Sequence, residues 1–552
     1  MRKSNFDVIV VGAGFAGLYM LYKLRDLGLS ACVLEKAGDV GGTWYWNRYP
    51  GARCDIESVE YSYSFSPELE QEWQWSERYA AQPEILRYLQ HVADRFDLRR
   101  DIRFNTVVTH ARWRDDEQDW QIGTDQGDTL TARFCIFGTG CLSSPNRPNI
   151  PGLDSFRGDI FVTGLWPHEG VDLTGKRVAV IGTGSSGIQS IPVIARQAQH
   201  LTVFQRTPNF VVPAQNRPLE DHEQAEIKQS YRDLREQARH TIGGVARGAP
   251  PSARPALATP PEDLHRDLDA RWEFGGLGGF LNSHPDTVFD EKAADCIAEY
   301  LRARVRGIVQ DPATAALLCP TTYPLGSKRL CVDIGYFETF NRDNVTLVDL
   351  HAQPIAGITE KGVRAGTAHY DVDVIVLATG FDAMTGALGK IDIRGRNNLA
   401  LADKWSAGPR SYLGLMSAGF PNMFTITGPG SPSVLSNMVT SIEQHVDWIG
   451  GLLATGCKGD RTVIEPMPEA EDVWTAHVTA VAEPTIFMQA NSWYLGANVP
   501  GKPRVFMPYI GGVGTYRAIC EAVAADGYPG FILDGAGKAA LPDFAAFLPI
   551  AA

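Results

Sequence analysis

The 552-residue chain lacks the long apolar runs of a membrane protein. No uncharged apolar stretch approaches the roughly 18 to 20 residues that a membrane-spanning helix requires. The N-terminus passes from two basic residues directly into the pattern FDVIVVGAG, without the apolar segment and small-residue cleavage site of a secretory signal peptide. We therefore expect a soluble, cytoplasmic protein that makes no membrane contact.

Paired cysteines and an excess of basic residues are also missing. The nine cysteines are odd in number and show neither C-x-x-C nor metal-ligand spacing, so we expect reduced thiols and no metal site. The formal net charge of −13 argues against a nucleic-acid partner, because phosphate backbones require clustered Lys and Arg. No sequence feature indicates an obligate protein partner.

Two segments do stand out, because each repeats one plan of apolar strand, glycine loop, helix and second strand. They are FDVIVVGAGFAGLYMLYKLRDLGLSACVLEK and KRVAVIGTGSSGIQSIPVIARQAQHLTVFQR. Length alone predicts about two to four domains. The repeats predict the α/β class, with two Rossmann-like doubly wound dinucleotide-binding domains.

The rest of the chain is assigned around these two units. Residues 215–325 are charged and Pro-rich, with a helix-like EDHEQAEIKQSYRDLREQARH, and predict an inserted helical subdomain. No new glycine loop begins after about residue 386, so we expect the C-terminal part to complete the first domain. The predicted domains are an FAD domain from 1–145 and 386–552, and an NADP domain from 146–214 and 326–385.

The first glycine loop consists of Gly12, Gly14 and Gly17. In such a loop the first glycine permits a tight turn, the second lets the backbone approach a pyrophosphate, and the third lets helix and strand pack closely. Glu35 closes the second strand, where a carboxylate accepts ribose hydroxyls and repels a 2′-phosphate. This loop therefore predicts FAD or NAD as the ligand.

The second loop has the opposite charge at its specificity position. Its strand ends in FQRTP, and a guanidinium at Arg206 beside Thr207 suits a ribose 2′-phosphate. We expect NADPH here, bound by Gly182, Thr183, Gly184, Ser185, Ser186, Gly187, Ile188, Gln189, Arg206 and Thr207.

One acid-ended and one base-ended loop imply FAD and NADPH in the same chain, and hence hydride transfer from nicotinamide to flavin. A flavin disulfide reductase would need a redox cysteine pair a few residues apart. The nearest candidates, Cys135 and Cys141, have five residues between them and flank a glycine turn, so we discount that class. Molecular oxygen is then the expected electron acceptor.

The stretch GGTWYWNRYPGARCDIESVEYSYSF closely resembles type I Baeyer–Villiger monooxygenases, flavoproteins that convert ketones to esters or lactones. The resemblance continues through KRLCVDIGYFETFNRDNV, LATGFDAMTGAL, SNMVTSIEQHVDWI and NSWYLGANVPGK, and so covers essentially the whole chain. It implies a C4a-peroxyflavin that attacks the ketone to give a tetrahedral (Criegee) intermediate, with ketone and O2 as the reacting partners.

The resemblance also assigns roles to single residues. Arg329, in GSKRLCVD, is the implied fixed cation near the flavin, and Asp55 is its expected partner. An arginine suits this role because it stays protonated in a dry site. Lys328 is the implied second positive contact to the NADPH phosphate, and Trp493 an NADP contact in a loop that closes over the cofactor. Implied FAD contacts are Thr43, Trp44, Tyr45, Trp46, Asp55, Tyr61, Val108 and Met438, and residues 428–438 are expected to line the ketone pocket.

One position departs from the family fingerprint Phe-x-Gly-x-x-x-His-x-x-x-Trp-Pro. Phe156, Gly158 and the Trp166-Pro167 pair match, but Val162 stands at the His position, and His168 lies beyond the Trp-Pro pair. In the family this segment links the nucleotide domains, and its His is associated with domain movement. We favour an enzyme that works without this His over an impaired chain, because the other functional positions match.

Three alternatives remain open from the sequence. A flavin monooxygenase acting on sulfur or nitrogen would use a protonated hydroperoxide as electrophile, and an uncoupled NADPH oxidase-like flavoprotein would release peroxide. A non-catalytic flavin-binding regulator would make Val162 a sign of decay. The Asp55 and Arg329 pair and the Trp166-Pro167 ending favour the ketone reaction.

Overall fold

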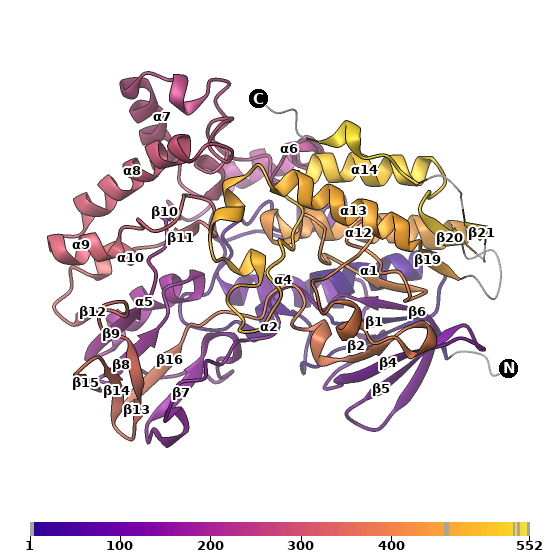
Figure 1. The fold of residues 1–552 in the computed structure, drawn as a ribbon, viewed down its shortest axis with the longest axis horizontal. Helices are drawn as coiled ribbons and strands as arrows, with labels where there is room; N and C mark the ends of the chain where they lie inside the picture. The colour runs from indigo at the N-terminus through magenta and orange to yellow at the C-terminus, as the bar shows by residue number, and fades with distance from the viewer. Residues whose placement is uncertain (1–4, 457–462, 534–535, 538–540, 549–552) are drawn as a thin grey trace.

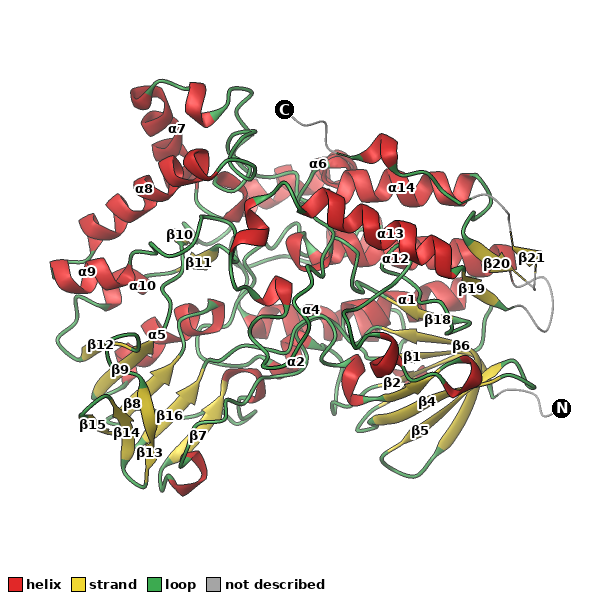
Figure 2. Ribbon diagram, viewed as in Figure 1, coloured by secondary structure: helices red, strands yellow, loops and turns green. Residues whose placement is uncertain are grey.

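The computed structural model describes residues 5–456, 463–533, 536–537 and 541–548. Figure 1 shows two separate groups of strands side by side, with helices above them. Figure 2, coloured by secondary structure, makes the same division visible as two yellow groups under a red helical layer. Each of the two glycine-loop segments of the sequence belongs to one of these strand groups. The α/β class predicted from the two repeats is confirmed.

The first sheet contains eight strands and draws on distant parts of the chain. Its order is β17-β4-β5-β6-β1-β2-β3, and β18 pairs with β6. The neighbours of β1 are both parallel to it, with Val10 opposite Val33 of β2 and Ile136 of β6. The strands are β1 (Phe6–Val11), β2 (Ala31–Leu34), β3 (Ile102–Arg103), β4 (Val108–Arg114), β5 (Asp119–Thr124), β6 (Thr129–Phe137), β17 (Asp392–Arg394) and β18 (Met423–Thr425).

The second sheet has five parallel strands in the order β12-β9-β8-β16-β7. Its central strand β8 is fully buried at Val178, Ala179 and Val180, which explains the unbroken apolar run in KRVAVIG. The strands are β7 (Asp159–Val162), β8 (Arg177–Ile181), β9 (His200–Gln205), β12 (Val345–Asp349) and β16 (Val374–Leu377). An antiparallel sheet of β13 (Ile355–Thr359), β14 (Gly362–Ala365) and β15 (Ala368–Asp371) lies beside it.

Helices cover the sheets and fill the space between them. In each unit the helix after the glycine loop packs on its own sheet, α1 (Phe15–Asp26) on β1 and α5 (Ser185–Gln197) on β8. Near the first loop lie α2 (Thr43–Trp46), α3 (Pro67–Glu72) and α4 (Gln82–Arg95). The C-terminal part contributes α11 (Leu401–Lys404), α12 (Met438–Gly456), α13 (Pro468–Ala482) and α14 (Val513–Ala525). α1 and α12 pack together, so the two ends of the chain share one core.

The charged, Pro-rich region is helical, as its composition indicates. It contains α6 (Asp221–His240), α7 (Pro261–Phe274), α8 (Glu291–Ile308) and α9 (Pro312–Leu318). Figure 1 shows α7, α8 and α9 standing above the second sheet. The chain then returns through β11 (Cys331–Asp333), which pairs with β10 (Val211–Pro213), and α10 (Tyr336–Thr339).

A third small sheet contains β19 (Ile464–Pro466), β20 (Phe531–Leu533) and β21 (Ala536–Gly537). Among the described residues, no helix combines the length and the apolar character needed to cross a membrane.

Candidate active site

The first glycine loop has no room for side chains. Gly12 has φ +104, and a Cβ there would lie 2.7 Å from the carbonyl oxygen of Gly138. A Cβ on Gly17 would lie only 1.8 Å from the Gly12 oxygen, so the first turn of α1 packs directly on the end of β1. The loop therefore presents bare backbone at a helix N-terminus, the surface that a pyrophosphate requires.

Glu35 lies beside this loop, at the end of β2. One carboxylate oxygen accepts the Ala13 N–H at 2.6 Å and the other accepts the Ala37 N–H at 2.7 Å. The side chain is buried, and burial raises its pKa while these backbone hydrogen bonds oppose the rise. The carboxylate is thus held in one orientation next to the glycine turn, where an acidic group recognises ribose hydroxyls.

The residues predicted to bind FAD lie in different surroundings. Trp44 is buried and donates its indole N–H to the Tyr61 hydroxyl at 3.3 Å, and Met438 begins α12 and packs on the same core. Val108 is buried in the sheet cluster at the start of β4, so a contact there would come from its backbone. Thr43 is exposed at the start of α2. Tyr45 and Trp46 turn toward the linker, where the Tyr45 ring lies 4.6 Å from the ring of His168.

The second glycine loop repeats the geometry of the first. Gly182 has φ +111, and a Cβ on Gly187 would lie 2.3 Å from the Gly182 oxygen. Thr183 donates to the Thr207 carbonyl at 3.1 Å, which ties the loop to the segment after β9. Of the other predicted contacts, Ser185 and Ser186 are the first two residues of α5, and Ile188 is buried in the core. The Gln189 side chain points away from the loop toward Tyr49 and Arg53.

Two cations face each other beyond this loop. Arg206 is exposed directly after β9, and the ammonium group of Lys328 lies 4.9 Å from the centre of the Tyr323 ring. Burial and the nearby Arg206 charge lower the pKa of Lys328. Among the described residues, neither side chain forms an ion pair. Two neighbouring positive charges without a carboxylate partner suit an anion, as a ribose 2′-phosphate would be.

Arg329 and Asp55 come from distant parts of the sequence and form an ion pair. The Nη2 and Nε atoms of Arg329 donate to one oxygen of Asp55 at 2.6 and 3.2 Å, and Nη1 donates to the Val434 carbonyl at 2.9 Å. Burial alone would lower the pKa of Arg329, but the Asp55 carboxylate outweighs it and the net direction is upward. The guanidinium is therefore a permanent positive charge held in one orientation.

Trp493 lies in a short 3-10 turn with Tyr494, whose ring is 4.3 Å away. The loop is tied to the segment after β16: Asn498 donates to the Phe381 carbonyl at 2.7 Å and Lys502 to the Asp382 carboxylate at 2.6 Å. Sequence patterns did not single out Tyr494, which is buried close to Arg329. The sequence pattern NSWYLGANVPGK had indicated only its neighbour Trp493 as a cofactor contact in this loop.

The linker with the altered fingerprint adjoins both units. Val162 ends β7, pairs with Leu377 of β16 and packs in an apolar cluster. Thr163 follows and contacts the Ser186 hydroxyl at 3.3 Å, while Trp166 is buried against Phe161. The valine thus fills an apolar position.

Comparison with known proteins identifies the family. Residues 9–239 match the family model described as pyridine nucleotide-disulphide oxidoreductase. A protein named Baeyer-Villiger monooxygenase from Pseudooceanicola batsensis is 43% identical over 96% of this chain and 97% of its own length. The chain belongs to the Baeyer–Villiger monooxygenases. The resemblance read from the motifs is confirmed, and the enzyme is an NADPH-dependent monooxygenase with FAD and NADP as cofactors.

Two further comparisons bear on the enzyme's chemistry. A solved structure titled oxidized steroid monooxygenase bound to NADP matches with a TM-score of 0.91 and 52% identity, and covers 96% of this chain and 99% of its own. Phenazine N-monooxygenase PhzNO1 from Lysobacter antibioticus is 42% identical over 96% of this chain and 97% of its own length. Relatives of similar identity therefore carry names that refer to different substrates.

The two loops and the unpaired cations fit the cofactors. The side-chain-free turns at Gly12 and Gly182, the fixed Glu35 carboxylate beside one of them, and the two cations beside the other are the features that FAD and NADP(H) require.

Proposed function

We propose that the enzyme inserts oxygen beside the carbonyl group of an apolar ketone, with Arg329 as the catalytic cation and Asp55 as the residue that positions it. The observation that carries this proposal is the hydrogen-bonded pair of Arg329 with Asp55 and the Val434 carbonyl. Bound reduced FAD supplies the activated oxygen. The chain's own residues supply the electrostatics.

A fixed guanidinium favours negative charge in the reaction. Arg329 attracts an anionic oxygen nucleophile, and it stabilises the negative charge that develops on the ketone oxygen as the carbonyl carbon is attacked. Its raised pKa means that it does not lose its proton to either group. Because Asp55 and Val434 hold three of its nitrogen atoms, the charge is aimed before substrate arrives, without reorganisation during the reaction.

The surroundings of this cation support an apolar substrate. The cluster that includes Val434 and Tyr494 is built from apolar and aromatic side chains of several segments. Other members of this cluster include Cys141, Leu142, Met384, Leu435, Phe487, Trp493, Phe506 and Met507. Apolar surroundings of this kind suit ketones with hydrocarbon substituents.

The cofactor contacts predicted from the sequence belong to the same proposal. The first loop with Glu35 would hold FAD. The second loop, with Arg206 and Lys328 at the 2′-phosphate, would hold NADPH. The eight described cysteines are all free, which supports our inference of a reducing, cytoplasmic location.

Product analysis tests the proposed reaction against oxidation at nitrogen or sulfur. Purified enzyme is incubated with NADPH, O2 and matched linear, cyclic, aryl and steroid ketones, and in parallel with a sulfide and an aromatic N-heterocycle. We expect esters or lactones by mass spectrometry in proportion to NADPH consumed. Faster formation of N-oxide or sulfoxide than of any ester would contradict the proposal, and NADPH loss as hydrogen peroxide alone would indicate an uncoupled oxidase.

A further inference from the structure

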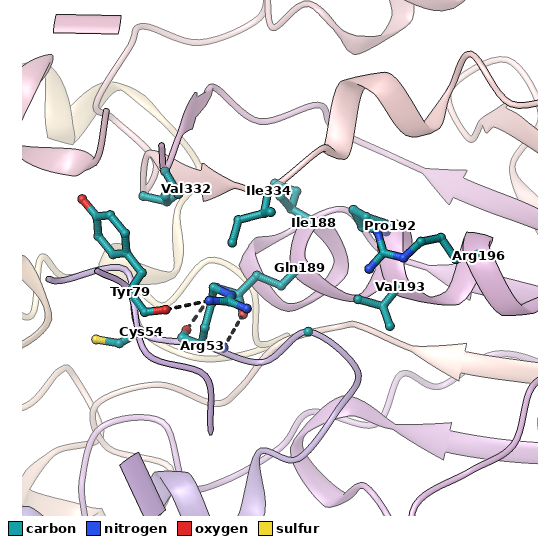
Figure 3. Close-up of a pocket in the computed structure, with 12 residues that line it drawn as sticks. Arg53, Cys54, Tyr79, Ile188, Gln189, Pro192, Val193, Arg196, Val332 and Ile334 are labelled. Carbon is teal, nitrogen blue, oxygen red and sulfur yellow. Dashed lines mark hydrogen bonds between the residues drawn. The ribbon is translucent and has the colours of Figure 1, made fainter. Parts of the chain in front are cut away.

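The side chain of Gln189 joins the second glycine loop to the segment that leads to Asp55. Gln189 lies in the first turns of α5, directly after Gly187 and Ile188. Its Oε1 atom accepts the Tyr49 hydroxyl at 2.8 Å and the Arg53 N–H at 3.3 Å, and its Nε2 atom donates to the Arg53 carbonyl at 3.2 Å. Figure 3 shows Gln189 and Arg53 facing each other, with the hydrogen bonds between these two residues drawn.

Segment 49–53 lies directly on α5 at this point. Gly51 has φ +81, and a Cβ there would lie 2.3 Å from the Gln189 carbonyl oxygen and 3.0 Å from Val193 Cγ2. Any larger residue would push the segment off the helix. Beside this contact is a cavity of about 70 Å³, which Cys54, Tyr79 and Val332 help to line. Packing between segment 49–53 and α5 is incomplete here. The three hydrogen bonds of the Gln189 amide therefore contribute much of the attachment between the two.

The same end of α5 also contacts the segment that carries Arg329. The Ser185 hydroxyl lies 3.3 Å from the Cys331 sulfur, and this thiol lies 3.7 Å from the Arg329 carbonyl oxygen. Burial, together with Asp55 and Cys331, raises the pKa of Tyr49. One helix start thus touches the chain on either side of the ion pair.

We propose that Gln189 and Tyr49 form a clasp that positions Asp55, and through it Arg329, relative to the bound nucleotide. The first turn of α5 is the part of the helix that a pyrophosphate orders. A shift of this turn moves segment 49–53 with it, because the Gln189 side chain bonds the Tyr49 hydroxyl and both backbone polar groups of Arg53. Occupancy of the nucleotide loop is therefore communicated to the catalytic cation, a coupling between two sites. This inference rests on the proposed function, since it takes the ion pair as the reaction's positive centre.

The variants that test the clasp keep the shape of each side chain. Gln189→Met removes all three hydrogen bonds at nearly constant volume, and Tyr49→Phe removes one hydroxyl while its ring stays in the core. The matched control is Tyr370→Phe, because the Tyr370 hydroxyl makes the same kind of bond to Gln353 Oε1, at 3.2 Å, on β15 away from the loop.

Two measurements on the holoenzyme report on the clasp. The first is ester formed per NADPH consumed, which we expect to fall at least about fivefold in Gln189→Met, since the loss of even one net hydrogen bond corresponds to that factor. Flavin reduction by NADPH is measured in the same variants, so that a change in this step is separated from a change in ester yield. The second is the change in flavin absorbance at saturating NADP⁺, which needs no turnover and should be weaker in Gln189→Met.

The double variant decides whether the two residues act together. Because the Tyr49 hydroxyl acts through its bond to the Gln189 amide, Tyr49→Phe should cause no further loss of coupling in the Gln189→Met background. Wild-type coupling and an unchanged absorbance response in Gln189→Met, or an equal loss in Tyr370→Phe, would overturn the clasp. If Gln189→Met does not fold, Tyr49→Phe alone decides by the same criteria. A wild-type enzyme that makes no ester refutes the proposed function, while the absorbance response to NADP⁺ still tests the clasp.

Discussion

Replacing Arg329 by alanine separates the two halves of the proposed reaction. The guanidinium is the only part of the pair that carries positive charge, and it donates to Asp55 and to the Val434 carbonyl. Its removal leaves the hydride donor and acceptor sites intact, because both glycine loops lie on other segments. We expect flavin reduction by NADPH to proceed within about threefold of the wild-type rate and ester formation to be abolished.

The magnitude follows from what remains at the site. Loss of one preorganised donor to a developing oxyanion costs about 10²- to 10³-fold in rate. Here the loss is larger, because the substitution also leaves the Asp55 carboxylate, whose side chain is only 20% exposed, without its partner. We therefore expect a fall of at least about 10³-fold.

Two assays measure the halves separately. Anaerobic stopped-flow absorbance follows reduction of the bound flavin, and gas chromatography with mass detection follows ester. Arg329→Lys is the matched variant, because it keeps a positive charge but not the two nitrogen atoms that converge on Asp55. Its rate of ester formation should lie between those of the wild type and Arg329→Ala. Ester formation by Arg329→Ala above about a tenth of wild type, or loss of flavin reduction with the oxygen reaction spared, would refute the assigned role.

The remaining predictions address the cofactor loops, the linker and the fold. Lys328→Ala should raise the KM for NADPH at least tenfold, because a charge-assisted hydrogen bond contributes about 1.4 kcal/mol or more. The KM for NADH should be unchanged in steady-state assays. Gly17→Ala should purify without FAD, as its absorbance will show, because the new Cβ meets the Gly12 oxygen. Val162→His should change turnover less than about tenfold, since a conformational role can be met by other contacts; a hundredfold gain in ketone oxidation would contradict this. Burial raises the pKa of Asp333 to about 7, so the folded state binds its proton more tightly than the unfolded state, and stability falls as pH rises from about 4 to 7. Asp333→Asn should flatten that fall in thermal melts, and an unchanged pH profile would show that the carboxyl does not cause it.

Much of the site could be predicted from local sequence patterns. The two glycine loops, Glu35 and Arg206 each follow a buried strand at a fixed place, because a parallel strand, its turn and the next helix form one local unit. Arg329 and Asp55 carry no such signal, since a basic residue before an apolar strand is ordinarily a solvated flank. Only their resemblance to a family pattern singled them out, and the structure then places them 2.6 Å apart.

What the sequence could not predict is how distant segments contact one another. Gln189 sits in the nucleotide motif, and the motif alone suggests a cofactor contact, yet its amide is bound to Tyr49 and Arg53. Tyr494 lies close to Arg329 because an irregular C-terminal loop folds back onto the segment after β16. Neither contact has a period or a spacing that a sequence pattern could display.

The strand order of the first sheet also has a consequence for synthesis on the ribosome. β6 ends at Phe137, but its partner β18 begins only at Met423, whereas the second sheet is complete by Leu377. At about 5 to 20 residues per second, the three residues of β6 that pair with β18 wait on the order of tens of seconds for their neighbour. The second nucleotide unit can therefore close while the first is still open, and a nascent chain arrested before Met423 would expose an apolar strand edge at Cys135–Phe137 to chaperones or to other chains.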